Sequence, residues 1–214
     1  NGPEINLGFE PQWLMVKNAG STGSWVISDV MRGFNVTDTQ NLIADDTATE
    51  TSADIGHYAE PTSTGFKLVS SSASSNQNNT KYIYMAIRRP TAVPESATDV
   101  FDVETSTSAT PRTWNSGFPV DLSVYCHRDT YTSNKFVGTR LTGNSAYLVT
   151  NATSKESSSS NLVEFDHSDK IVENNLGGTS SKVNYMWKRA PHFCDVVAYT
   201  GDGTTSRYVN HNLE

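Results

Sequence analysis

Short apolar segments alternate with polar, turn-forming segments along the whole chain. Each is a few residues long, rich in aromatic and β-branched side chains, and bounded by Gly, Asp, Asn or Ser; the clearest are residues 12–17, 25–27, 42–43, 66–69 and 82–87. Strands of this length and spacing are typical of a β-sandwich or a β-barrel. No stretch of the sequence keeps apolar residues at i, i+3 and i+4 over three helical turns. The sequence therefore predicts an all-β fold.

Three stretches of the chain are unsuited to a core. Residues 70–79 and 154–161 consist largely of Ser and Asn, so we expect exposed loops there. Residues 88–96 contain two prolines and show no periodicity, which is typical of a linker.

The sequence contains an internal repeat. Three short segments each occur twice, in the same order and at a similar interval. Residues 8–9 recur as 117–118, residues 42–50 as 148–156, and residues 81–88 as 182–189. The last pair predicts that Tyr84-Met85 and Tyr185-Met186 hold equivalent places, with one residue of each pair facing the core. In the second pair we interpret the shared polar residues as parts of a turn: Asp45, Thr47, Asn151 and Thr153.

The repeat predicts tandem antiparallel β-sandwich units, the first at residues 1–98 and the second at residues 99–194. Residues 101–103 resemble residues 193–196, which indicates that a new unit begins near each. We therefore expect residues 195–214 to be the leading strands of a third unit. The chain is then a window cut from a longer array.

The composition narrows the classes of partner. The chain has 16 basic and 23 acidic residues and a net charge of −7, and its polarity comes mainly from Ser, Thr and Asn. With no basic block, it has little electrostatic attraction for a phosphate backbone, so we expect no nucleic-acid partner. No apolar run approaches the ~18 residues needed to span a bilayer, so we expect no membrane insertion. Cys126 and Cys194 are too few for a disulfide framework, and either two free thiols or one disulfide would fit.

Motifs at both ends of the chain belong to one longer pattern. Residues 199–203 read Tyr-Thr-Gly-Asp-Gly, and residues 211–213 read His-Asn-Leu. Residues 5–18 supply the rest: Asn-Leu-Gly, a proline and an apolar strand that ends in Val-Lys-Asn. This pattern resembles the tandem repeats in tail and appendage proteins of tailed bacteriophages, which usually have a His where this chain has Ile5. The resemblance covers the whole chain but is looser in the second unit, where residues 119–120 depart from it.

The resemblance implies jelly-roll-like sandwich units and a virion structural protein, a segment of a tail fibre or similar appendage that presents loops for host attachment. Its partners would be other virion tail proteins and a host cell-surface glycan or protein, and its location the virion tail, outside cells. Fibres are commonly trimeric, so the full-length protein could be a homotrimer. The alternative is a secreted bacterial adhesin or a carbohydrate-binding module, which would share the fold.

The densest polar cluster in the sequence is a candidate metal site. Glu164, Asp166 and Asp169 alternate with other residues around His167, and oxygen ligands on such a loop could hold a divalent cation such as calcium. The alternative is a solvated turn between two strands, because the cluster lacks the Gly and the distal carboxylate of a calcium loop. We expect no other cofactor.

Four aromatic residues are candidate ligand-binding residues because they lie near turns or outside the matched strands: Trp114, Tyr131, Tyr58 and Tyr147. An exposed ring can stack against the apolar face of a sugar. The alternative is that these rings cover the ends of the sandwich. Other large side chains lie in core-like strands: Trp13, Trp25, Tyr84, Tyr185 and Met186.

No pattern in the sequence supports catalysis. The five histidines show no zinc-binding spacing, and the sequence has neither a Gly-x-Ser-x-Gly elbow nor a phosphate-binding glycine loop. We therefore expect that the chain is not an enzyme. Glycan degradation is the competing hypothesis, because tail appendages often carry depolymerases that use paired carboxylates.

Overall fold

The computed structural model describes residues 2–50, 57–89, 92–107, 111–129, 133–159, 162–174 and 181–213. In these ranges the chain forms strands β1 to β16 and a 3₁₀ turn, η1 (Ala97–Asp99), and no α-helix. The predicted all-β fold is confirmed. The chain divides into two compact units, residues 1–90 with 197–212 and residues 91–196 with 213–214.

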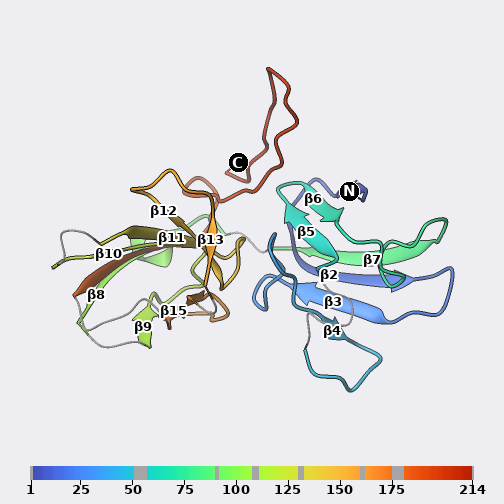
Figure 1. Cartoon of the computed structure of the whole chain (residues 1–214), viewed down its shortest axis with the longest axis horizontal. Helices are drawn as coiled ribbons and strands as arrows, with labels where there is room; N and C mark the ends of the chain where they lie inside the picture. The colour runs from blue at the N-terminus through green and yellow to red at the C-terminus, as the bar shows by residue number, and fades with distance from the viewer. Residues whose placement is uncertain are drawn as a thin grey trace. The chain divides into compact units, whose positions relative to one another are not determined.

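The first unit consists of two antiparallel sheets. Its strands are β1 (Glu4–Asn6), β2 (Pro11–Asn18), β3 (Trp25–Asp29), β4 (Leu42–Ile43), β5 (Ala59–Thr62), β6 (Gly65–Leu68) and β7 (Tyr82–Arg88). One sheet has the order β1-β6-β5 and the other the order β4-β3-β2-β7 (Figure 1). The core lies between the sheets because the strands alternate in burial: Leu14 and Val26 from one sheet belong to the same buried cluster as Phe66 and Leu68 from the other.

The second unit also has two antiparallel sheets. Its strands are β8 (Phe101–Ser106), β9 (Arg112–Asn115), β10 (Leu122–His127), β11 (Lys135–Thr139), β12 (Ala146–Val149), β13 (Ser157–Ser158), β14 (Val163–Glu164), β15 (Lys170–Glu173) and β16 (Lys182–Trp187). The sheet orders are β14-β15-β9 and β13-β12-β11-β10-β16-β8. Trp114 and Ile171 from the smaller sheet form a buried cluster with Tyr125 and Met186 from the larger.

The strands of the two units pair in the same order. The sheet β1-β6-β5 corresponds to β9-β15-β14, and β4-β3-β2-β7 corresponds to β12-β11-β10-β16. The second unit has two further strands, β13 beside β12 and β8 beside β16.

The turn that leads from the smaller sheet to the larger has the same hydrogen bonds in both units. The amides of Leu7 and Gly8 both donate to Thr64 O, at 2.7 and 3.0 Å. The amides of Ser116 and Gly117 both donate to Asp169 O, at 2.9 Å each. The two glycines have φ of 77° and 73°. No described atom lies within 4 Å of a Cβ built on either, so the backbone conformation rather than crowding requires glycine there.

A second turn is also shared. Asp45 Oδ1 accepts a hydrogen bond from the amide of Trp25 at 2.8 Å, and Asn151 Oδ1 accepts one from the amide of Lys135 at 3.0 Å. Each side chain thereby satisfies the first amide of a strand, β3 or β11. The interpretation of Asp45 and Asn151 as turn residues is confirmed.

The third repeated segment corresponds with a shift of one residue. The amide of Ala19 donates to Lys81 O at the start of β7, and the equivalent bond runs from the amide of Arg128 to Ser181 O. Lys81 therefore corresponds to Ser181 and not to Lys182, the residue that the sequence similarity selects.

The shift changes which side chains face the core. Met85 is 52% exposed and Met186 is fully buried, and it is Ala86 that corresponds to Met186. The strands β7 and β16 do hold equivalent places in their sheets, but the predicted match of residues 84–85 with residues 185–186 is wrong by one position. A one-residue slip in a strand exchanges its two faces.

The last part of the chain forms no strand within the described residues 195–213, and residues 197–212 group with the first unit. That these residues lead into a third unit stays a prediction.

Candidate functional site

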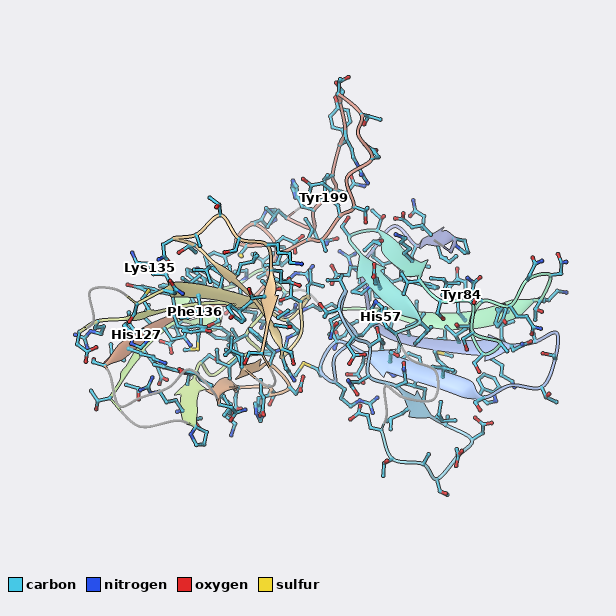
Figure 2. The ribbon with its side chains drawn as sticks, viewed as in Figure 1. His57, Tyr84, His127, Lys135, Phe136 and Tyr199 are labelled. Atoms are coloured by element: carbon cyan, nitrogen blue, oxygen red, sulfur yellow. The ribbon has the colours of Figure 1, made fainter. Side chains whose placement is uncertain are left out.

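Large apolar side chains are exposed along β7, an edge strand of the first unit. Ile83, Tyr84, Met85 and Ile87 are between 47% and 52% exposed, and Figure 2 labels Tyr84 on this strand. No other strand of this unit has an exposed large apolar side chain in the part of the chain that the structure describes. Exposed apolar side chains concentrated on one element mark an interaction surface.

The main-chain groups of β7 divide between β2 and the open side of the strand. Hydrogen-bonded pairs alternate with non-hydrogen-bonded pairs in an antiparallel ladder. Because Lys81 bonds to β2, the groups of Ile83 and Met85 also face β2, and those of Tyr84 and Ala86 point to the open side. No described strand pairs with that side.

The side chains of β7 divide between two faces. Tyr82 and Ala86 pack against the core of the unit, and the Tyr84 ring makes an edge contact with Phe66, with ring centroids 5.4 Å apart. The other face carries Ile83, Met85 and Ile87, which are each about half exposed. The surface that we call the β7 edge consists of these three side chains and the outward main-chain groups of Tyr84 and Ala86.

The second unit covers the corresponding edge with a strand of its own chain. All six residues of β8 pair with β16, from Phe101 opposite Trp187 to Ser106 opposite Lys182. The rings of Phe101 and Trp187 lie 5.3 Å apart, and those of Tyr185 and Trp187 lie 6.2 Å apart. The two strands thus share an apolar row on the outer face of the sheet.

A carboxylate on the inner face of β8 joins this strand to β9. Glu104 Oε2 accepts a hydrogen bond from the amide of Asn115 at 2.8 Å. Burial raises the pKa of Glu104 and the nearby charge of Asp102 raises it further, whereas the hydrogen bond from Asn115 lowers it. β8 is therefore an integral part of the second unit.

A cavity of about 400 Å³ in the first unit is a second candidate region. The β5–β6 hairpin forms one wall and residues 198–210 form the other, on which Figure 2 labels Tyr199. The Arg207 guanidinium lies 5.6 Å from the centre of the Tyr199 ring and 3.5 Å from the Asp202 carboxylate. Hydrogen bonds from Thr204 lower the pKa of Asp202. An exposed ring beside charged groups is suited to a polar ligand such as a sugar.

The interior of the second unit contains a charge cluster. The Glu173 carboxylate contacts Lys182 Nζ and lies 3.6 Å from Arg112 Nη1, and all three side chains are at most 1% exposed. Burial lowers the pKa of Lys182, whereas its hydrogen bond and charge interaction with Glu173 raise it. The cluster is closed to solvent, so we assign it a structural role.

Two of the three candidate metal ligands, Glu164 and Asp166, have separate partners for their carboxylates. Glu164 Oε1 accepts a hydrogen bond from Asn174 at 2.6 Å, the Asp166 carboxylate accepts one from Asn144, and the main-chain oxygen of Asp169 is used in the turn described above. Burial is the main cause that raises the pKa of Asp166. The described residues contain no group of three His, Cys, Asp or Glu side chains that could hold a metal ion. The turn alternative accounts for these contacts.

The aromatic candidates are buried or partly buried where the structure describes them. Trp114 is 1% exposed, and Tyr58 is fully buried with its hydroxyl 3.1 Å from Ser28 Oγ. Tyr147 is partly buried, with its ring 5.5 Å from that of Phe136. Tyr131 lies outside the described residues. Trp114 and Tyr58 are therefore core residues and offer no exposed platform, because both lie between the sheets.

Two further findings concern both units within the described residues. Cys126 and Cys194 are free thiols. Within the described ranges, no helix has the length and apolar character needed to cross a membrane.

The β7 edge is not predicted by the sequence, in which Tyr84 belongs to a core-like strand. Apolar residues at every position from 82 to 87 are typical of a strand buried on both faces. Nothing in residues 82–87 distinguishes an edge strand from a central one, so this surface is recognised only from the sheet order.

Comparison with known protein families shows a match over residues 1–90, to a family described as a domain of unknown function (DUF7483). The matched range contains all seven strands of the first unit and is less than half of the chain. No curated protein and no solved structure matches the chain significantly.

Proposed function

We propose that the chain is a structural segment of a tail fibre or similar appendage of a tailed-bacteriophage virion. In this proposal jelly-roll-like units repeat along the appendage and present loops for attachment to the host. The partners would be other tail proteins and a glycan or protein of the host surface. The role requires no chemical step.

The observation that carries the proposal is the shared main-chain frame of the two units. Strand order, the paired amides at Gly8 and Gly117, and the Asp45 and Asn151 turns correspond, whereas the cores differ in chemistry. Duplicated units that each bury their own core are suited to a spacer, since units can be added without redesigning their neighbours. The phage-type sequence pattern supports the biological setting, and the net charge of −7 is compatible with work outside cells.

Mass spectrometry and immunogold labelling of purified phage particles test the proposal. We expect peptides of this chain among the virion proteins and gold particles on the tail, with antibody preabsorbed on purified chain as the control. Particles that contain the chain but show an unlabelled tail would contradict the assignment.

The cavity beside Tyr199 favours a second candidate function, that of a secreted adhesin or carbohydrate-binding module. A glycan array probed with the chain tests it, with Tyr199→Ala as the variant. Tyr185→Ala is the matched control, because it removes an exposed tyrosine from the second unit. Binding that is lost in the first variant and kept in the second would support this function.

The competing hypothesis of glycan degradation has a direct assay. Incubation of the chain with host capsule or lipopolysaccharide should leave the length of the polysaccharide unchanged. Shortened chains would overturn the proposal of a purely structural role.

A further inference from the structure

We propose that the outer faces of the two larger sheets pair with the same faces of a second copy of this chain. The pairing has a two-fold axis that runs along a row of apolar side chains on each face, which we call the outer row. The proposal rests on the strand registers of the larger sheets and not on the phage assignment. It involves the flat face of each sheet and not its edges.

The outer row of the first unit crosses all four strands of the larger sheet. Ile27 lies opposite Leu42 and Met15, and Met15 lies opposite Met85. None of the four side chains belongs to the buried cluster between the sheets, whereas Leu14, the neighbour of Met15 along β2, does. The solvated face of an antiparallel sheet normally carries polar residues, so an apolar outer face indicates a sheet that is covered on both sides.

The outer row of the second unit crosses the corresponding strands and continues onto β8. It consists of Leu148, Val137, Val124, Tyr185 and Val103, each opposite the next. Leu148 is 44%, Val103 40% and Tyr185 37% exposed, although β8 covers the edge of this sheet. The exposure of the row is therefore a property of the face and does not depend on an open edge. Apolar side chains gathered on one face mark an interaction surface.

The outer rows agree in character where the cores do not. In the core, Leu68 of the first unit corresponds to the carboxylate Glu173 of the second. Every outer-row position that the units share is apolar in both, from Leu42 and Leu148 at one end to Met85 and Tyr185 at the other. A partner that covers these faces must therefore suit both units.

The chemistry and the size of the faces favour a second copy as that partner. The outer rows carry no charge, so they suit an apolar protein surface. Four strands about 4.8 Å apart and three outward-facing rows about 7 Å apart give each face an area on the order of 400 Å². A stable interface buries about 800 Å² on each partner, so it requires both faces. A second copy has two such faces on one chain, and two linked contacts strengthen each other.

The side chains on either side of the outer row favour one orientation of the axis. One side carries a lysine in each unit, Lys17 or Lys135, and the other side carries a tryptophan, Trp13 or Trp187. An axis along the row places the lysine side of one copy over the tryptophan side of the other, where cation–π contacts can form. An axis along the strands would place the two lysine sides over each other. The favoured axis also places each outer-row residue over its own equivalent, and such an interface closes at the dimer.

Sedimentation equilibrium tests the proposal, and we expect a monomer–dimer equilibrium. Met85→Glu/Leu148→Glu places like charges over each other at an end of each outer row. Both side chains are exposed, so the variant should fold, as circular dichroism would show. Its self-association should be at least about tenfold weaker than that of the native chain. The matched control is Val93→Glu, which replaces a 57% exposed apolar side chain outside both sheets and should leave association unchanged.

A mixing experiment tests the axis. Met85→Lys/Leu148→Lys should also associate weakly by itself, but an equimolar mixture with the glutamate variant should form mixed dimers, because opposite charges then face each other. A mixture of Val93→Glu with Val93→Lys should associate like the native chain. A mixture of the double variants that associates no better than either alone would overturn the axis. A native chain that stays monomeric at millimolar concentration, or a double variant that associates as strongly as Val93→Glu, would overturn the proposal as a whole.

Discussion

The Glu173 carboxylate holds two buried cationic side chains together in the interior of the second unit. Its side chain is 1% exposed and contacts two cationic side chains, Lys182 and Arg112, that are fully buried. Glu173→Leu would leave two buried cations without the carboxylate that they share. Removal of one partner from a buried ion pair costs about 3–5 kcal/mol, so we expect this loss in the free energy of unfolding of the second unit.

Denaturant unfolding monitored by amide hydrogen exchange at β15 and β16 measures this loss, because exchange reports the two units separately. A control variant, Glu156→Leu, removes an exposed carboxylate from the same unit and should change the free energy of unfolding by less than about 0.5 kcal/mol. A Glu173→Leu variant within about 1 kcal/mol of the native chain would refute the reasoning, because that is the range of exposed ion pairs.

A triple variant separates lost charge balance from lost packing. Glu173→Leu/Lys182→Met/Arg112→Met replaces the cluster with apolar side chains of similar size, as the first unit has Leu68 in the place that corresponds to Glu173. Such replacements are often neutral or stabilising, so the triple variant should regain most of the loss. A triple variant as unstable as Glu173→Leu alone would show that packing, not charge, sets the cost.

Three further predictions test other parts of the structure. Burial raises the pKa of Tyr58 to about 12, so the folded first unit keeps a proton that the unfolded chain loses above pH 10. This group should lower the stability of the first unit from pH 10 to 12 by up to about 1.4 kcal/mol per pH unit. Tyr58→Phe should remove this contribution in denaturation of the first unit at pH 9 and 11, whereas the buried Tyr125 should still lower the stability of the second unit. Asp45→Ala should lower the free energy of unfolding by about 0.5–1.5 kcal/mol, because it removes the acceptor for the amide of Trp25. Asp45→Asn keeps an acceptor oxygen and should cost little. Thermal unfolding of both variants measures the difference. Met186→Ala should destabilise the chain by about 2–5 kcal/mol in urea unfolding, because Met186 is fully buried. Met85→Ala should destabilise it by under about 0.5 kcal/mol, because Met85 is exposed. Equal losses would contradict the one-residue shift.

The all-β fold class could be predicted from the sequence, because the residues that indicate a strand or a turn lie close together along the chain. Asp45 and Asn151 could be recognised as turn residues, because each occupies the same place in a short repeated pattern of Asp or Asn followed by Thr. In the structure, each side chain accepts a hydrogen bond from the first amide of a strand. Register is not local in this way. Sequence similarity matches Met85 with Met186. The pairing of β7 with β2 and of β16 with β10, however, decides which side chain faces the core.

The candidate sites were harder to predict, because burial depends on which strands become neighbours. Trp114 lies close to a turn in the sequence, and yet it is buried because β9 packs over the larger sheet. Residues 82–87 have the composition of a central strand, and only the sheet order reveals that β7 is at an edge. The Glu173 cluster joins β9, β15 and β16, which no sequence spacing could indicate.

The glycine turns at Gly8 and Gly117 have a stereochemical consequence. Their positive φ values are the mirror image of a conformation that L-residues adopt readily, and the space around each position is open among the described atoms. An L-alanine there would be strained by its own backbone although its methyl group has room, whereas the same φ is favourable for a D-alanine. In both units, chirality rather than size therefore disfavours most L-residues at this turn, and Asn is the kind of residue that tolerates such a φ best, as Asn79 does elsewhere in the chain.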